Sequence, residues 1–196
     1  MSETKGKDFS QTGFSEAPRG IIAEVTDYWA SLRTGSRPPM RQQLEPAALA
    51  RNLPHVFLAE LISPRVARLR ICGQQVEEIL GMEMRGMPVT AMFCGTARNE
   101  VMQAMEQVSL GARVTLVLEG ESGFGLPRMT ATLALLPLCD ETGRISRVMG
   151  VLARDGEPGR TPRRFTLAKA VQVNETTSGD EAPTRPALRV IDGGKS

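Results

Sequence analysis

The side chains that could act as acids, bases or metal ligands are few and widely spaced in this chain. His55 is the only histidine, and a single histidine could serve as a general base or as a haem ligand. It lies between Pro54 and an apolar segment, where a capping or hydrogen-bonding role is more common. We therefore interpret His55 as a possible polar contact and expect no catalytic residue at this position.

An enzyme built around a pocket needs an acid–base pair held in a dry site. The carboxylates that could join His55 are Glu60, Glu77 and Glu78, and the last two are expected on a short, exposed helix. No pair stands out among them. The sequence therefore predicts a protein that is not an enzyme, with a small enzyme of cone-shaped α+β fold as an alternative.

The three cysteines, Cys72, Cys94 and Cys139, are far apart and include no C-x-x-C pair. An odd number of separated cysteines indicates neither a disulfide framework nor a zinc site. We expect free thiols, no bound metal and the reducing environment of the cytoplasm.

Positive charge is local rather than global, since the net charge of the 196 residues is only +2. Arg68 and Arg70 alternate with apolar residues. Arg70 could pair with Glu60, stack on Trp29 or bind an anion, but a packed and solvated arginine is the more common case. A second group of arginines follows residue 154. An adaptor that binds anionic partners through this arginine-rich tail is a further alternative, although the balanced charge argues against nucleic acid.

Hydrophobic periodicity predicts the elements that position these residues. The stripe from Ile21 to Leu32 has helical spacing and should end near Gly35. Alternating or continuous apolar runs predict strands over residues 55–62, 66–72, 112–120, 128–138 and 145–154. Two further helices are expected over residues 73–81 and 95–111. Strands on both sides of a helical middle, joined by short turns, predict an α+β fold with an antiparallel sheet.

The ends of the chain differ in composition from its middle. We predict a disordered N-terminus over residues 1–16, one domain over residues 17–154 and a disordered polar tail over residues 155–196. Within that tail, the apolar sequence LRVI (residues 188–191) could add to a sheet edge of the same chain or of a partner. No apolar run is long enough to span a membrane.

Three segments carry a resemblance to a known family: YWASLRTGSRPPMRQQLEP, LPHVFLAELI and RLRICGQQVEEILGMEMRGMPV. On these residues the chain resembles single-domain PAS-like proteins of alphaproteobacteria, a family of unassigned function. The resemblance covers about residues 20–153. It implies a five-stranded antiparallel sheet with short helices on one face and an N-terminal amphipathic helix.

The resemblance also implies two kinds of site. A ligand pocket between the sheet and its short helices should be lined by apolar residues: Phe57, Leu69, Ile71, Met84, Met92, Phe93, Val101 and Met105. A dimer or partner contact is expected on the first helix, at Ile21, Val25, Tyr28 and Trp29. His55 and Arg70 are possible polar contacts.

The function that follows is a non-enzymatic sensory or regulatory module of bacterial signal transduction. Its expected partners are a second copy of the chain or a signalling protein, with a small-molecule ligand possible. The longer central helix lacks histidine, which argues against haem. Neither Cys72 nor Cys94 lies in the cysteine motif of photoactive flavin domains, which argues against that cofactor.

Overall fold

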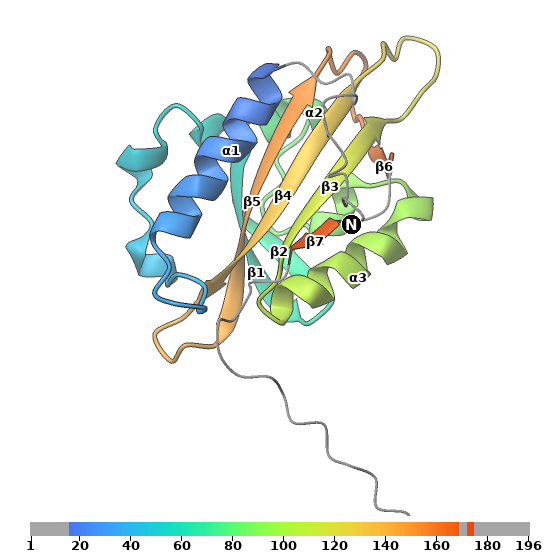
Figure 1. Ribbon diagram of the computed structural model, residues 1–196. Coiled ribbons are helices and arrows are strands. Elements are labelled where there is room, and N and C mark those ends of the chain that lie inside the picture. Colours follow the sequence, from blue (N-terminus) through green and yellow to red (C-terminus); the bar gives the residue numbers. More distant parts are fainter. Residues whose placement is uncertain (1–15, 169–171, 175–196) are drawn as a thin grey trace, which may run out of the picture.

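The structure is a computed structural model that describes residues 16–168 and 172–174 of the chain. These residues form an antiparallel sheet with helices on both faces (Figure 1). The strands are β1 (Val56–Ser63), β2 (Val66–Cys72), β3 (Arg113–Gly120), β4 (Thr130–Cys139), β5 (Ile145–Asp155), β6 (Phe165–Leu167) and β7 (Gln172–Asn174). The α-helices are α1 (Glu16–Ser31), α2 (Gln74–Leu80) and α3 (Arg98–Ser109). Short 3-10 turns are η1 (Arg41–Gln43), η2 (Pro46–Leu49), η3 (Leu53–His55), η4 (Val89–Met92) and η5 (Gly95–Ala97).

The strand order is β2-β1-β5-β4-β3-β6, and β7 also pairs with β3. Every ladder between these strands is antiparallel, which confirms the predicted α+β class. The predicted count of five strands is wrong, because β6 and β7 extend the sheet beyond β3. Both come from the segment after residue 154, which the sequence analysis assigned to a disordered tail.

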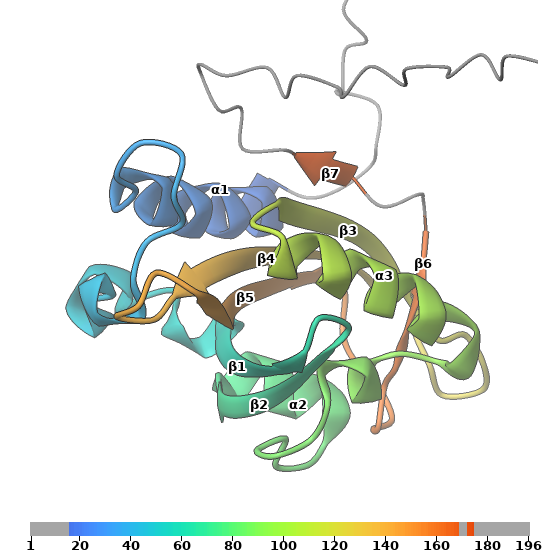
Figure 2. The ribbon, with the colours of Figure 1, turned by 90° about the horizontal axis from the view of Figure 1, so that it is seen from below.

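Helices lie on both sides of the sheet (Figure 2), and a cluster of apolar side chains packs on each face. The helix-side core lies between the sheet and the helices α2 and α3, and Phe57, Leu69, Leu133 and Met105 are among its buried members. The outer-face core lies between the sheet and α1. It contains Val25, Trp29, Leu49, Val56, Ala134, Leu136, Leu138, Met149 and Val151. Successive residues of β4 alternate between the two cores, as the pleat of a strand requires.

Helix α1 is held to the outer face by polar contacts as well as by packing. The indole Nε1 of Trp29 donates a hydrogen bond of 2.9 Å to the backbone oxygen of Pro137 in β4. Nearer the start of the helix, the Glu24 carboxylate accepts hydrogen bonds from the side chains of Arg51, at 2.7 and 3.1 Å, and Asn52, at 2.9 Å. The contacts of Glu24 with Arg51 and Asn52 join α1 to the connector that precedes β1.

A bulge in β2 changes which side chains face outward. Leu58 pairs with Ile71, but the next residue of β1, Ala59, pairs with Leu69. Arg70 is therefore an extra residue in β2, as in a β-bulge. Ile71 leaves the face that Leu69 occupies, joins Leu58 on the outer face and is 57% exposed. The prediction that Ile71 lines a pocket on the helix side is therefore wrong.

Residues 155–168 are part of the folded domain. Arg163 is buried, and its guanidinium donates hydrogen bonds of 2.7 Å to the backbone oxygens of Pro127 and Pro158. Phe165 of β6 is also buried and lies with its ring centroid 6.5 Å from that of Phe93. The prediction of disorder is wrong for this segment. The predicted disordered N-terminus, up to residue 15, and the LRVI sequence lie outside the described residues.

Candidate functional site: an apolar groove on the outer face

The space expected for a ligand on the helix side is filled by side chains. Seven of the eight predicted pocket residues, Phe57, Leu69, Met84, Met92, Phe93, Val101 and Met105, are buried in the helix-side core. The Phe57 ring lies over Gly150, where an added Cβ would overlap it. A hollow beside Val101 and Met105 measures about 20 Å³, far below the roughly 300–1,000 Å³ of ligand pockets. These side chains form a packed core in the part of the chain described.

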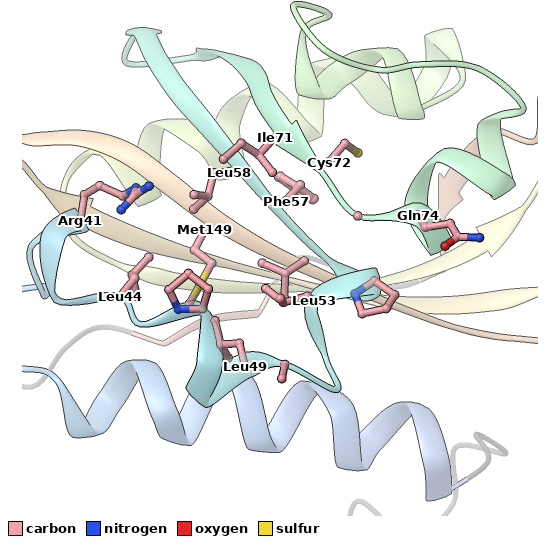
Figure 3. A pocket seen from close by; sticks show the side chains of 15 residues that line it. Arg41, Leu44, Leu49, Leu53, Phe57, Leu58, Ile71, Cys72, Gln74 and Met149 are labelled. Atoms are coloured by element: carbon pink, nitrogen blue, oxygen red, sulfur yellow. The ribbon is translucent and has the colours of Figure 1, made fainter.

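A larger hollow of about 520 Å³ lies on the outer face. The sequence analysis did not predict a pocket on this face, although two of its eight predicted pocket residues, Phe57 and Ile71, line it. We call it the outer groove. Its apolar lining includes Leu44, Leu49, Leu53, Leu58, Ile71 and Met149, and the Arg41 and Gln74 side chains lie at its two ends (Figure 3). Leu53 and Ile71 remain 40% and 57% exposed. A concave apolar surface with a few polar groups is the usual form of a ligand site.

The connector from residue 41 to residue 55 forms one side of the outer groove and is fixed at several points. Pro46 is the first and Pro54 the second residue of short 3-10 turns, where their missing N–H groups cost no hydrogen bond. The Tyr28 hydroxyl accepts a hydrogen bond of 2.7 Å from the backbone N–H of Glu45. At the other end, Gly73 lies so close to the backbone of Pro54 that any Cβ would overlap it. The groove therefore has a defined shape between two fixed ends.

Cys72 carries the one nucleophilic group among the residues that line the outer groove. Burial, followed by the charge of Glu77, raises the pKa of the thiol to about 12. A thiol with so high a pKa is protonated near neutral pH and is a weak nucleophile. Arg41 and Gln74 supply polar contacts at the ends, where they can orient an apolar occupant.

The predicted polar residues have separate partners. The Nδ1 of His55 donates to the backbone oxygen of Leu152 at 3.3 Å, a structural role. Arg70 forms an ion pair of 2.7 Å with Glu60, which confirms one of the three predicted roles of this arginine. The guanidinium over the Trp29 ring belongs to Arg33, at 5.4 Å from the ring centroid.

The carboxylates of α2 are also engaged locally. Glu78 accepts hydrogen bonds from Gln74 and Gln75, and Glu77 accepts one from the backbone of Met84. Within residues 16–168 and 172–174, no group of three or more histidine, cysteine or acidic residues could hold a metal ion.

The four predicted partner-contact residues of α1 face the sheet of their own chain. Val25 and Trp29 are buried in the outer-face core, and Ile21 and Tyr28 pack against it. Val25 and Trp29 cannot contact a partner while α1 lies on the sheet, so the prediction is wrong for these two. None of the helices described has both the length and the apolar character needed to cross a membrane.

Sequence reasoning missed the outer groove for two reasons. The bulge that exposes Ile71 leaves no mark in the alternating pattern of β2. Leu53 and Met149 come from segments far apart in the chain, and nothing local relates them. The one available signal was the proline-bounded connector, whose apolar residues Leu44 and Leu49 must cover some part of the sheet.

Comparison with known proteins points to one family. A family model described as a PAS domain matches residues 20–153. No curated protein matches the chain. One similar solved structure is titled as an RNA-binding light-oxygen-voltage receptor, with 17% identity and a TM-score of 0.44; the match covers 61% of this chain and 36% of that one. Another, from a study of a flavin analogue in a light-oxygen-voltage domain, has 18% identity and a TM-score of 0.42, over 57% of this chain and 84% of that one.

Proposed function

Because this chain belongs to the PAS domain family, whose members are generally sensory and signalling modules, we propose that it is a regulatory module of bacterial signal transduction. It acts by binding an apolar small molecule or an apolar partner segment in the outer groove, without catalysis. The three cysteines are free thiols, which suits a module that works in the reducing cytoplasm.

The observation that carries this proposal is the contrast between the two faces of the sheet. The helix-side core is filled where a PAS-like pocket was expected, whereas the outer face carries a groove of about 520 Å³. An occupant that covered Ile71 would remove a large apolar side chain from water, and complete burial of such a side chain is worth about 1.5–3 kcal/mol. The groove therefore offers both space and a driving force for binding.

The two alternative functions have less support. A pocket enzyme needs an acid and a base that converge on one reacting atom, whereas His55 and Glu60 contact different partners. An adaptor that uses the arginines after residue 154 would need them exposed. Of the three that the structure describes, Arg163 is buried, Arg164 is partly buried and Arg160 is exposed.

The groove proposal is tested with Ile71→Asp and a fluorescent apolar probe, N-phenylnaphthylamine. A carboxylate on the floor of the groove must lose water when the probe binds, so we expect the affinity to fall about tenfold, equivalent to about 1.4 kcal/mol. The measurement is a fluorescence titration of the full chain at equilibrium.

Ile62→Asp is the matched control. Ile62 is also an isoleucine on the outer side of the sheet, is 52% exposed and does not line the groove. We expect it to bind the probe as the unmodified chain does. Equal losses in the two variants, or no loss in either, would refute the groove as the binding site. Native mass spectrometry of protein purified from its own host would then identify any retained molecule.

A further inference from the structure

We propose that the outer groove is occupied in the resting protein by residues 188–191 of the same chain, the apolar tail segment LRVI. This inference rests on the function proposed above and extends it, because it makes the chain its own competitor for the groove. The segment lies outside the described residues, and the argument uses its sequence and its distance from the last described strand.

The apolar tail segment is chemically unlike its surroundings. Residues 175–196 are dominated by polar, glycine and proline residues, and Leu188, Val190 and Ile191 stand together among them. In an extended segment, alternate side chains point to one side. Leu188 and Val190 would then face the groove, with Arg189 and Ile191 on the opposite side of the segment.

The segment can reach the groove from where the described chain ends. Val173 of β7 pairs with Val114, and the same row crosses the sheet through Leu135 and Gly150 to Phe57 beside the groove. Four steps between neighbouring strands amount to about 19 Å. A path over α1 adds about 10 Å on each side of the helix, because a helix is about 10 Å across. The whole path is therefore about 40 Å long.

Fourteen residue steps separate Asn174 from Leu188, and a fully extended chain of that length spans about 46 Å or slightly more. The segment therefore reaches the groove without displacing α1.

The sheet edges are less suitable for this segment than the groove is. The free side of β3 is already paired with β6 and β7. On β2, the backbone of Leu69 is hydrogen-bonded to Met87 and Gly86. A further strand could therefore add only beside the three-residue strands β6 and β7, or along the part of β2 that Gly86 and Met87 leave free. The groove instead needs apolar side chains and leaves the backbone of the segment in water.

The charges of Arg41 and Asp192 also favour placement of the apolar tail segment in the groove. Arg41 lies at one end of the groove, with its side chain directed along it (Figure 3). Asp192 follows the apolar tail segment directly, so a segment lying in the groove can bring its carboxylate to this guanidinium.

The test uses the full chain with isotopically labelled isoleucine, leucine and valine methyl groups. We expect nuclear Overhauser effects between the Ile71 methyl group and the methyl groups of Leu188 and Val190. The double variant Leu188→Asp, Val190→Asp should abolish them and should raise the affinity for N-phenylnaphthylamine. The increase is about tenfold if the segment occupies the groove for nine-tenths of the time.

The matched control is Thr176→Asp, Thr177→Asp, which adds the same charge to the tail outside the apolar segment. It should leave both the Overhauser effects and the probe affinity unchanged. Absence of the effects, together with unchanged affinity in the Leu188, Val190 variant, would refute the tail proposal. The groove function would still stand if Ile71→Asp weakened the probe.

Mixing two differently labelled samples shows whether the segment in the groove comes from the same chain or from a second copy. In the mixed sample, Overhauser effects between Ile71 methyl groups labelled in one chain and Leu188 or Val190 methyl groups labelled only in the other would mean that the groove holds the tail of a second copy. That result would overturn the assignment to the same chain.

Discussion

Phe57 and Gly150 face each other across the β1–β5 ladder on the helix side of the sheet. The ring covers the position where any other residue at 150 would place its Cβ. Interiors are packed at nearly crystalline density, so a ring in this position leaves no room for a ligand. Gly150 and Phe57 therefore leave this part of the interior filled by side chains.

Gly150→Ala should therefore destabilise the protein by about 1–3 kcal/mol, the usual cost of overpacking a core. Urea denaturation measures the change in the free energy of unfolding. Gly95→Ala is the control, because no atom lies within 4 Å of its added Cβ; we expect a change within about 0.5 kcal/mol.

A second substitution checks that the ring is the cause. Phe57→Leu creates space beside residue 150, so the double variant should be less destabilised than the sum of the single variants. Additive losses, or a Gly150→Ala cost equal to that of Gly95→Ala, would mean that the ring does not lie over residue 150.

Among the elements, α1 and the connector before β1 act as one unit. The Glu24 carboxylate on α1 binds Arg51 and Asn52 on the connector. The hydrogen bond from Asn52, together with the charge of Arg51, lowers the pKa of Glu24 below its ordinary value of 4.5. The contact that ties the side of the groove to α1 is therefore sensitive to acid.

The sign of this sensitivity follows from the lowered pKa. The folded state favours the ionised carboxylate, so the contribution of Glu24 to stability is complete above about pH 5 and is lost as pH falls through the folded-state pKa. Glu24→Gln should reduce stability near neutral pH, and the reduction should shrink as the pH falls below 4.5. Denaturation midpoints across this range measure the effect.

Glu83→Gln serves as the control for Glu24→Gln, since Glu83 is exposed and makes no ion pair with the described residues. It should lower stability little at any pH. A difference between Glu24→Gln and the unmodified protein that stayed constant from pH 7 to pH 3 would contradict the role assigned to the Glu24 carboxylate.

The order of elements could be predicted from the sequence, because helical and strand periodicities differ and the turns are short. The antiparallel sheet and the helical segment between β2 and β3 follow from that pattern. The face on which Ile71 lies could not be predicted, since a bulge depends on the register between β1 and β2. Register is a property of two strands together, and alternation within β2 alone predicts the regular ladder.

Across the whole molecule, the domain extends further than its alternating strands suggested. The sequence between residues 155 and 164 is rich in glycine, proline and arginine, a composition typical of linkers. The structure nevertheless packs Arg163 against two carbonyls, that of Pro158 nearby in the chain and that of Pro127 far from it. The side chain ties the start of β4 to the segment that leads into β6, a tertiary contact that composition cannot reveal.

Arg163→Met tests whether these two hydrogen bonds hold residues 156–168 in place. The substitution keeps an extended side chain but leaves two carbonyl groups without their donor, at a cost of about 1–3 kcal/mol for a buried group. Hydrogen exchange followed by mass spectrometry should show faster exchange in residues 156–168 than in the unmodified chain.

Arg164→Met is the neighbouring control, because the Arg164 side chain is only partly buried. It should leave exchange in residues 156–168 close to that of the unmodified chain. Similar exchange in the two variants would mean that Arg163 does not hold the segment.

The packing of the helix-side core determines which side chain of β2 is exposed to water on the outer face. In a regular ladder Arg70 would stand opposite Leu58, and Ile71 would turn beneath the sheet towards Phe57. The interior there is already full, so the isoleucine has no place in it. The exposed apolar surface at Ile71 is thus a consequence of the packed core on the other face of the sheet. A change of register in β2 that removed the bulge would place the Arg70 guanidinium where the Ile71 side chain now lies.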